Sequence, residues 1–109
     1  MKKVEAIINP HLLLAVQESL EENGVSGMTV MEVKGLGRTR GHVAIHRDIP
    51  HAVDFLPKTY IMVLVEDEQV HKVVTGIRLG AYTGKNGDGV IWVTAVESMM
   101  KIRTAFAVH

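Results

Sequence analysis

Residues 58–77, KTYIMVLVEDEQVHKVVTGI, change from a strand pattern to a helix pattern and decide the fold. The first eight residues are an apolar, β-branched run typical of a strand. Acidic residues 66–68 follow, where a helix N-terminus attracts negative charge. Apolar residues then recur at helical spacing, at Val70, Val73, Val74 and Ile77. We expect Gly76 and Gly80 to weaken this helix and then end it.

The same order of strand and helix opens the chain. Residues 3–9 are a short β-branched run that predicts a buried strand. Asn9 is an N-cap candidate, and Pro10 follows at the first helical position, where its missing N–H costs nothing. An apolar stripe then predicts an amphipathic helix of about four turns, stopped at residues 23–24. The stripe is Leu13, Val16 and Leu20.

Two more strands and a long loop complete the pattern. Apolar and polar residues partly alternate from Met28, which predicts a strand that ends at Gly35. Residues 90–96, VIWVTAV, predict the last strand. Residues 35–54 lie between the second and third strands and show no sustained period. Connections of that length inside a small domain are usually functional.

The order strand, helix, strand, strand, helix, strand predicts an α+β fold. In so short a chain the economical packing is ferredoxin-like (βαββαβ), an antiparallel sheet with both helices on one face. The other face would then expose many β-branched residues. We therefore expect a homo-oligomer in which sheets pack together.

Composition excludes several classes of protein. A length of 109 residues suits one domain, 1–109, and no apolar run approaches the about 20 residues that span a bilayer. The formal net charge is zero, so we expect no nucleic-acid partner and no membrane insertion. The absence of cysteine makes the cytoplasm the expected location. Acidic residues are scattered and no GxSxG motif is present, so we expect no enzyme.

Two glycine-rich segments are candidate anion sites, residues 35–41 (GLGRTRG) and 83–89 (TGKNGDG). Glycine lets backbone N–H groups converge on phosphate oxygens, and nearby cations supply the opposite charge. Lys101 and Arg103 add cations late in the chain. The alternative, plain turns in which Asp88 caps backbone amides, stays open.

Three of the six histidines, His42, His46 and His51, lie within the long loop. Imidazole is a common ligand of transition metals, so a three-histidine metal site is one hypothesis. Their spacing matches no standard site, and solvated loop side chains are the simpler explanation.

Four motifs in this order resemble the PII signal-transduction proteins, regulators of nitrogen metabolism. They are MTVMEVKGLGRTRGH (28–42), VDFLPK (53–58), TGKNGDG (83–89) and KIRT (101–104), with the opening MKKVEAII. The resemblance covers nearly the whole chain. It implies a ferredoxin-like subunit, a homotrimer with inward-facing sheets, and ATP or ADP bound in clefts between subunits as an allosteric ligand, with Mg²⁺ accompanying ATP.

The resemblance also implies roles for individual residues. Near the adenine it places Ile7, Met28, Thr29 and Leu64. Near the ribose and phosphates it places Gly35, Gly37, Arg38, Gly87, Asp88, Gly89, Lys101 and Arg103, with Arg38 reaching a terminal phosphate. Near a 2-oxoglutarate-like effector it places Thr39, Gly41 and Lys58.

Several residues depart from the family pattern. His51 replaces the tyrosine that many bacterial members uridylylate, so that modification cannot occur there. Thr39 replaces a glutamine that touches Mg²⁺ and 2-oxoglutarate, and its side chain is too short for both contacts. Asn9 and Val90 stand where lysines are usual, and Lys101 replaces an arginine. These changes weaken the case for tight MgATP binding relative to ADP or AMP.

The resemblance predicts a regulator that acts through loop 36–54 on a transporter, a metabolic enzyme or a transcription regulator. Segment 83–89 would be its phosphate loop and segment 97–109 its C-terminal part. Two alternatives are a metal-responsive module that uses the loop histidines and a purely structural trimer with vestigial clefts.

Overall fold

The computed structural model describes residues 1–37 and 54–108. The chain begins with β1 (Lys2–Ile8), a 3-10 turn η1 (Pro10–Leu12) and helix α1 (Leu13–Glu22). Strands β2 (Thr29–Gly37) and β3 (Asp54–Val65) follow. A second turn, η3 (Asp67–Gln69), leads into α2 (Val70–Ala81). Strands β4 (Gly89–Ala95), β5 (Met99–Lys101) and β6 (Phe106–Val108) end the described chain.

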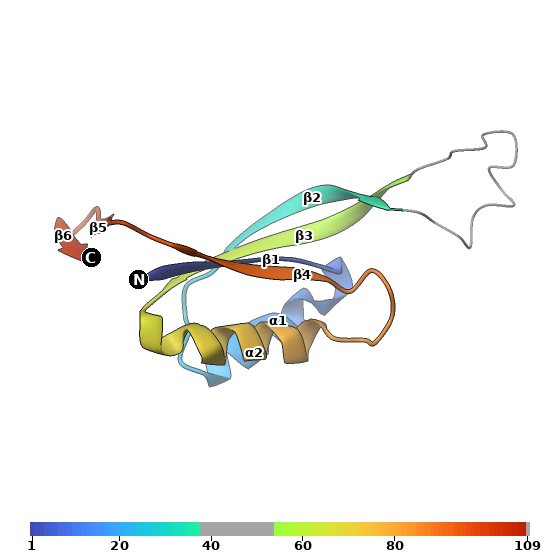
Figure 1. Cartoon of the computed structure of the whole chain (residues 1–109), viewed down its shortest axis with the longest axis horizontal. Coiled ribbons are helices and arrows are strands. Elements are labelled where there is room, and N and C mark those ends of the chain that lie inside the picture. Colours follow the sequence, from blue (N-terminus) through green and yellow to red (C-terminus); the bar gives the residue numbers. More distant parts are fainter. Residues whose placement is uncertain (38–53, 109) are drawn as a thin grey trace, which may run out of the picture.

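The main sheet has the strand order β2-β3-β1-β4, and every neighbouring pair is antiparallel. Both helices lie on one face of this sheet, and the other face is left open (Figure 1). The predicted ferredoxin-like α+β fold is therefore confirmed. The short strands β5 and β6 form a separate hairpin, which the sequence pattern did not reveal.

The core lies between the sheet and the two helices. Alternate residues of β1 and β3 point to the helices because successive strand side chains face opposite sides. Burying each such aliphatic side chain contributes about 1.5–3 kcal/mol. The largest fully buried side chains are Val4, Ile8, Val16, Leu20, Ile61, Val63, Val73 and Ile77.

Helix α2 runs through Gly80 to Ala81, so the prediction that Gly80 ends the helix was wrong. A Cβ on Gly80 would lie 2.8 Å from the Cα of Val16 and 2.9 Å from its backbone N. Gly80 therefore lets the backbones of α1 and α2 approach closely. This packing outweighs the low helix propensity of glycine, which costs about 1 kcal/mol relative to alanine.

The second predicted strand also ends later than expected. Gly35 pairs with Leu56, and Gly37 pairs with Asp54, so both glycines belong to the β2–β3 ladder and not to a loop. Strand β3 pairs with β1 only from Thr59 onward, so its first residues, Pro57 included, form a two-stranded ribbon with β2. Proline is tolerated at such an edge. Backbone hydrogen bonding therefore extends β2 and β3 into residues whose apolar and polar side chains do not alternate regularly.

Candidate functional site

The loop 83–89 is organised around the carboxylate of Asp88. Its Oδ2 accepts hydrogen bonds from the backbone N–H of Thr83 at 2.8 Å and of Gly84 at 2.9 Å, and its Oδ1 accepts one from the Thr83 hydroxyl. The same hydroxyl oxygen accepts the N–H of Lys85 at 3.2 Å. Asp88 therefore caps backbone amides, as one interpretation of the sequence proposed. The role of Thr83 was not predicted from the sequence, although a threonine opening a turn that ends in aspartate is a usable signal.

These bonds favour the ionised carboxylate. The Thr83 hydroxyl bond is the largest cause that lowers the pKa of Asp88, and the bonds from the Thr83 and Gly84 amides and the charge of Lys58 act in the same direction. Partial burial opposes them. The loop is therefore held by a charged Asp88 throughout the neutral range.

We predict that acid loosens loop 83–89 in a single titration step. Because the folded pKa of Asp88 lies below its unfolded value, the clamp stabilises the fold above the unfolded pKa and is lost as pH falls through the folded pKa. NMR titration should show the amide signals of Thr83 and Gly84 moving together in that acidic range. Asp88→Asn should remove the step, and an unchanged step in this variant would assign it to another group.

Gly89 begins β4 directly against the end of β1. Its φ is +111°, and a Cβ there would lie 1.8 Å from the carbonyl oxygen of Ile7. No side chain fits this position. The close approach brings together Ile7, Asp88 and Gly89, three of the residues that the sequence resemblance assigns to a nucleotide.

Lys58 connects three elements at this end of the sheet. Its Nζ donates to Oδ1 of Asn9 at 2.7 Å and to the carbonyl oxygen of Gly87 at 2.8 Å. A Cβ on Gly35 would lie 3.2 Å from Cγ of Lys58, so Gly35 is part of the same cluster. Asn9 makes no side-chain capping bond to the following turn. Its side chain serves Lys58 instead, a contact between residues too far apart in sequence for local patterns to reveal.

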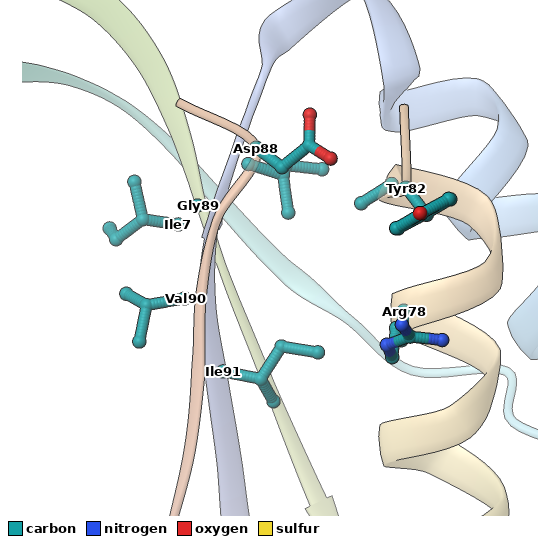
Figure 2. A pocket seen from close by; sticks show the side chains of 9 residues that line it. Ile7, Arg78, Tyr82, Asp88, Gly89, Val90 and Ile91 are labelled. Carbon is teal, nitrogen blue, oxygen red and sulfur yellow. The ribbon is translucent and has the colours of Figure 1, made fainter. Parts of the chain in front are cut away.

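A cavity of about 460 Å³ opens between the start of β4 and the last turn of α2 (Figure 2). Ile7, Asp88 and Gly89 line it together with Arg78 and Tyr82 of α2 and its C-cap. The Arg78 guanidinium lies 5.0 Å from the centroid of the Tyr82 ring, a cation–π distance. Neither residue was predicted from the sequence, because helical spacing shows that they are neighbours but not what they face.

A second set of sequence-predicted residues lies at the opposite end of the sheet. Leu64 is separated from Lys58 by about 20 Å of strand β3, and it pairs with Lys3 near the start of β1. Thr29 begins β2 at this same end. The hairpin of β5 and β6 also lies there (Figure 1). The predicted residues at this end are Met28, Thr29, Leu64, Lys101 and Arg103.

The structure therefore divides the predicted nucleotide residues into two clusters. The first, the glycine-loop cluster, contains Ile7, Gly35, Gly87, Asp88 and Gly89, with Lys58 among them. Gly37 lies at the same end of the sheet, two residues beyond Gly35 on β2. The second, the C-terminal cluster, is the set just given. Outside the described residues lie Arg38, Thr39, Gly41, His42, His46 and His51. Among residues 1–37 and 54–108, no group of three His, Asp or Glu side chains is arranged to hold a metal ion.

The open face of the sheet carries a buried carboxylate. Glu5, a charge within an apolar strand, accepts hydrogen bonds from the Tyr60 hydroxyl at 2.5 Å and from Trp92 Nε1 at 3.0 Å. Lys3 lies 3.3 Å from the carboxylate. The Tyr60 bond is the main cause that lowers the pKa of Glu5, and the same bond raises the pKa of Tyr60. The charged carboxylate of Glu5 therefore has its hydrogen-bond and ion-pair partners within this face.

The chain is similar to proteins of one known family. The family model described as nitrogen regulatory protein P-II matches residues 1–105. This chain belongs to the P-II family. The nitrogen regulatory protein P-II of Azospirillum brasilense is 49% identical over 104 residues, which cover 95% of this chain and 93% of that protein. Those of Pasteurella multocida and Haemophilus influenzae are 50% and 49% identical over the same shares.

Membership of the P-II family gives the general role. P-II proteins are signal-transduction regulators in nitrogen metabolism and not enzymes, and as a family they bind adenine nucleotides and act on partner proteins. The chain is thus a P-II signal-transduction regulator. Within the described ranges, no helix combines the length and apolar character needed to cross a bilayer.

Proposed function

We propose that this chain acts in the cytoplasm as a homotrimeric P-II regulator that binds ATP, ADP or AMP in clefts between protomers. The nucleotide state controls loop 36–54, which contacts a partner such as a transporter, a metabolic enzyme or a transcription regulator. A 2-oxoglutarate-like effector would bind near Thr39, Gly41 and Lys58, and Mg²⁺ would accompany ATP.

The separation of the two clusters is the observation that carries this proposal. Gly87 contacts Lys58 at one end of the main sheet, whereas Arg103 follows β5, which lies beyond the other end (Figure 1). A single nucleotide would therefore not reach both residues within one protomer. Two copies placed side by side can join the glycine-loop cluster of one protomer to the C-terminal cluster of the next. The resulting cleft would combine backbone amides with cations, which is the chemistry that a polyphosphate requires.

The open sheet face supports assembly. Met31 and Val90 are exposed on this face, and Glu5 at its centre already has hydrogen-bond partners. An apolar face with a satisfied charge can pack against copies of itself without leaving a buried carboxylate unpaired. Three such faces turned inward would form the proposed trimer.

The proposed mechanism is a population shift of the long loop. Gly37 ends β2, and Arg38 follows it directly, so Arg38 lies at the root of loop 36–54. A ligand with a terminal phosphate would hold Arg38, whereas AMP or an empty cleft would release it. Each state then favours a different set of loop conformations, and the partner protein distinguishes them.

Isothermal titration of the purified chain tests this function, with light scattering to give the mass. We expect a trimer that binds ADP or ATP in the micromolar range and gives no heat with Zn²⁺ or Cu²⁺. Heat with the metals alone would instead favour the histidine module. A trimer that binds none of the adenine nucleotides would indicate vestigial clefts. A monomer would contradict a nucleotide site shared between protomers.

A further inference from the structure

The cavity between α2 and the start of β4 lies on the helix side of the main sheet. Ile8 and Ala81 line it and belong to the core between the sheet and the helices, and Ile91 packs against that core. In Figure 2, Ile91 points toward α2, whereas Ile7 and Val90 point to the other side of the strands. That other side is the open face, through which the proposed trimer packs. This α2–β4 cavity is therefore built by one protomer and lies behind the open face.

The walls of the α2–β4 cavity suit a small apolar molecule. Its volume is about 460 Å³, within the range of about 300–1,000 Å³ that is usual for small-molecule sites. The ring of Tyr82 stands beside the aliphatic walls, and this residue is 59% exposed. The Arg78 guanidinium lies 5.0 Å from the ring centroid, and a Cβ on Gly84 would lie 3.3 Å from the Tyr82 hydroxyl oxygen. The ring is thus held between two neighbours, and its exposed part is available to a ligand.

The two charged side chains of the cavity differ in their partners. Both carboxylate oxygens of Asp88 already accept hydrogen bonds within loop 83–89. Arg78 takes part in none of the ion pairs formed in the described part of the chain. In Figure 2, Asp88 lies near Tyr82, and Arg78 lies one helical turn farther along α2. A negative group bound to Arg78 would therefore point away from the carboxylate of Asp88.

We propose that the α2–β4 cavity binds a small aromatic carboxylate. The aromatic ring of the ligand packs against Ile91 and Ala81 and meets the exposed part of the Tyr82 ring. Its carboxylate accepts two parallel hydrogen bonds from the Arg78 guanidinium, which cation–π contact with Tyr82 keeps in position. This ligand supplies both an apolar body for the walls and the negative charge that Arg78 lacks. The site is additional to the proposed nucleotide cleft and does not depend on it.

NMR titration of the purified chain with benzoate tests this site. We expect saturable shifts of the Ile8 and Ile91 methyl signals, with a dissociation constant in the millimolar range that suits so small a ligand. Benzamide has nearly the same shape but no charge. It should bind at least about tenfold more weakly, because it cannot form the charge-assisted hydrogen bonds with Arg78.

Substitutions on α2 separate charge from shape. Arg78→Gln should weaken benzoate binding at least about tenfold and bring it to the level of benzamide. Tyr82→Leu should also weaken binding, whereas Tyr82→Phe keeps the ring and should bind as the wild type does. Lys72→Gln is the matched control, because it removes an exposed cation from the same helix outside the cavity. Arg78 and Tyr82 are themselves exposed, and an unchanged Tm shows that each variant has folded.

Three results would overturn the proposal. They are the absence of saturable shifts in the wild type, equal benzoate affinity in Arg78→Gln and the wild type, and competitive displacement of benzoate by ADP. The last result would mean that the cavity is part of the nucleotide site. A wild-type chain that binds benzoate but no adenine nucleotide would contradict the proposed function and support this second site.

Discussion

Coexpression of Arg38→Ala and Arg103→Ala chains is expected to restore the tight ADP binding that each variant lacks alone. In the proposed cleft, each substitution would remove charge-assisted hydrogen bonds worth about 1.5–3 kcal/mol, so either variant should bind ADP about ten- to a hundredfold more weakly. Arg38 follows β2, and Arg103 follows β5 at the other end of the sheet. In a mixed trimer, one cleft therefore receives an intact Arg38 from one chain and an intact Arg103 from its neighbour.

Two affinity tags allow the mixed trimers to be isolated and titrated. Lys72→Ala, an exposed change on α2 outside both clusters, serves as the control and should retain wild-type affinity. Mixed trimers that bind no better than the two variants separately would show that the site does not cross the subunit boundary. The same result would remove the main support for the proposed function.

Gly89→Ala is expected to cause the largest loss of stability of any conservative glycine change in the described chain. A Cβ would lie 1.8 Å from the Ile7 carbonyl oxygen, and φ is +111°. The strand would have to move away from β1 at the point where Ile8 pairs with Gly89. We expect a cost of at least about 3 kcal/mol, or a fall in Tm of more than about 12 °C.

Two other glycines separate the two contributions to the stability loss of Gly89→Ala, which are the positive φ and the contact with Ile7. Gly24 has φ +79° and no neighbour within 4 Å, so Gly24→Ala should show backbone strain alone, about 1 kcal/mol. Gly27 has neither feature, so Gly27→Ala should change the free energy of unfolding by less than about 0.5 kcal/mol. Urea unfolding at one protein concentration measures the free energy of unfolding of all three variants. Equal losses at Gly89 and Gly24 would mean that the contact with Ile7 is unimportant.

The element order was predictable because it follows from local periodicity. The alternation and apolar runs of the strands and the i, i+3, i+4 spacing of the helices are read from neighbouring residues, and the structure confirms both helices and all four main strands. The ends of elements were less predictable. Gly35 and Gly37 continue β2 because β3 supplies hydrogen-bond partners, and that partner cannot be seen in the local sequence.

The glycines show the same division within the site. The sequence alone does not distinguish Gly80 from Gly89. In the fold, Gly80 permits close contact between the two helices, whereas Gly89 permits close contact between β4 and β1. Asn9 fits the pattern of a helix cap, but its side chain binds Lys58 in a distant strand. Each outcome depends on atoms supplied from elsewhere in the fold.

By itself the sequence determined the order of strands and helices, the open face of the sheet, the glycine-rich motifs and their likeness to the P-II family. Only the tertiary structure decided that Lys58 is held by Asn9 and Gly87, and that the predicted nucleotide residues separate into two clusters. The physical reason is the distance along the chain over which each kind of interaction acts. Periodicity and turn chemistry act over a few residues, whereas these contacts depend on where antiparallel pairing places segments that are distant along the chain.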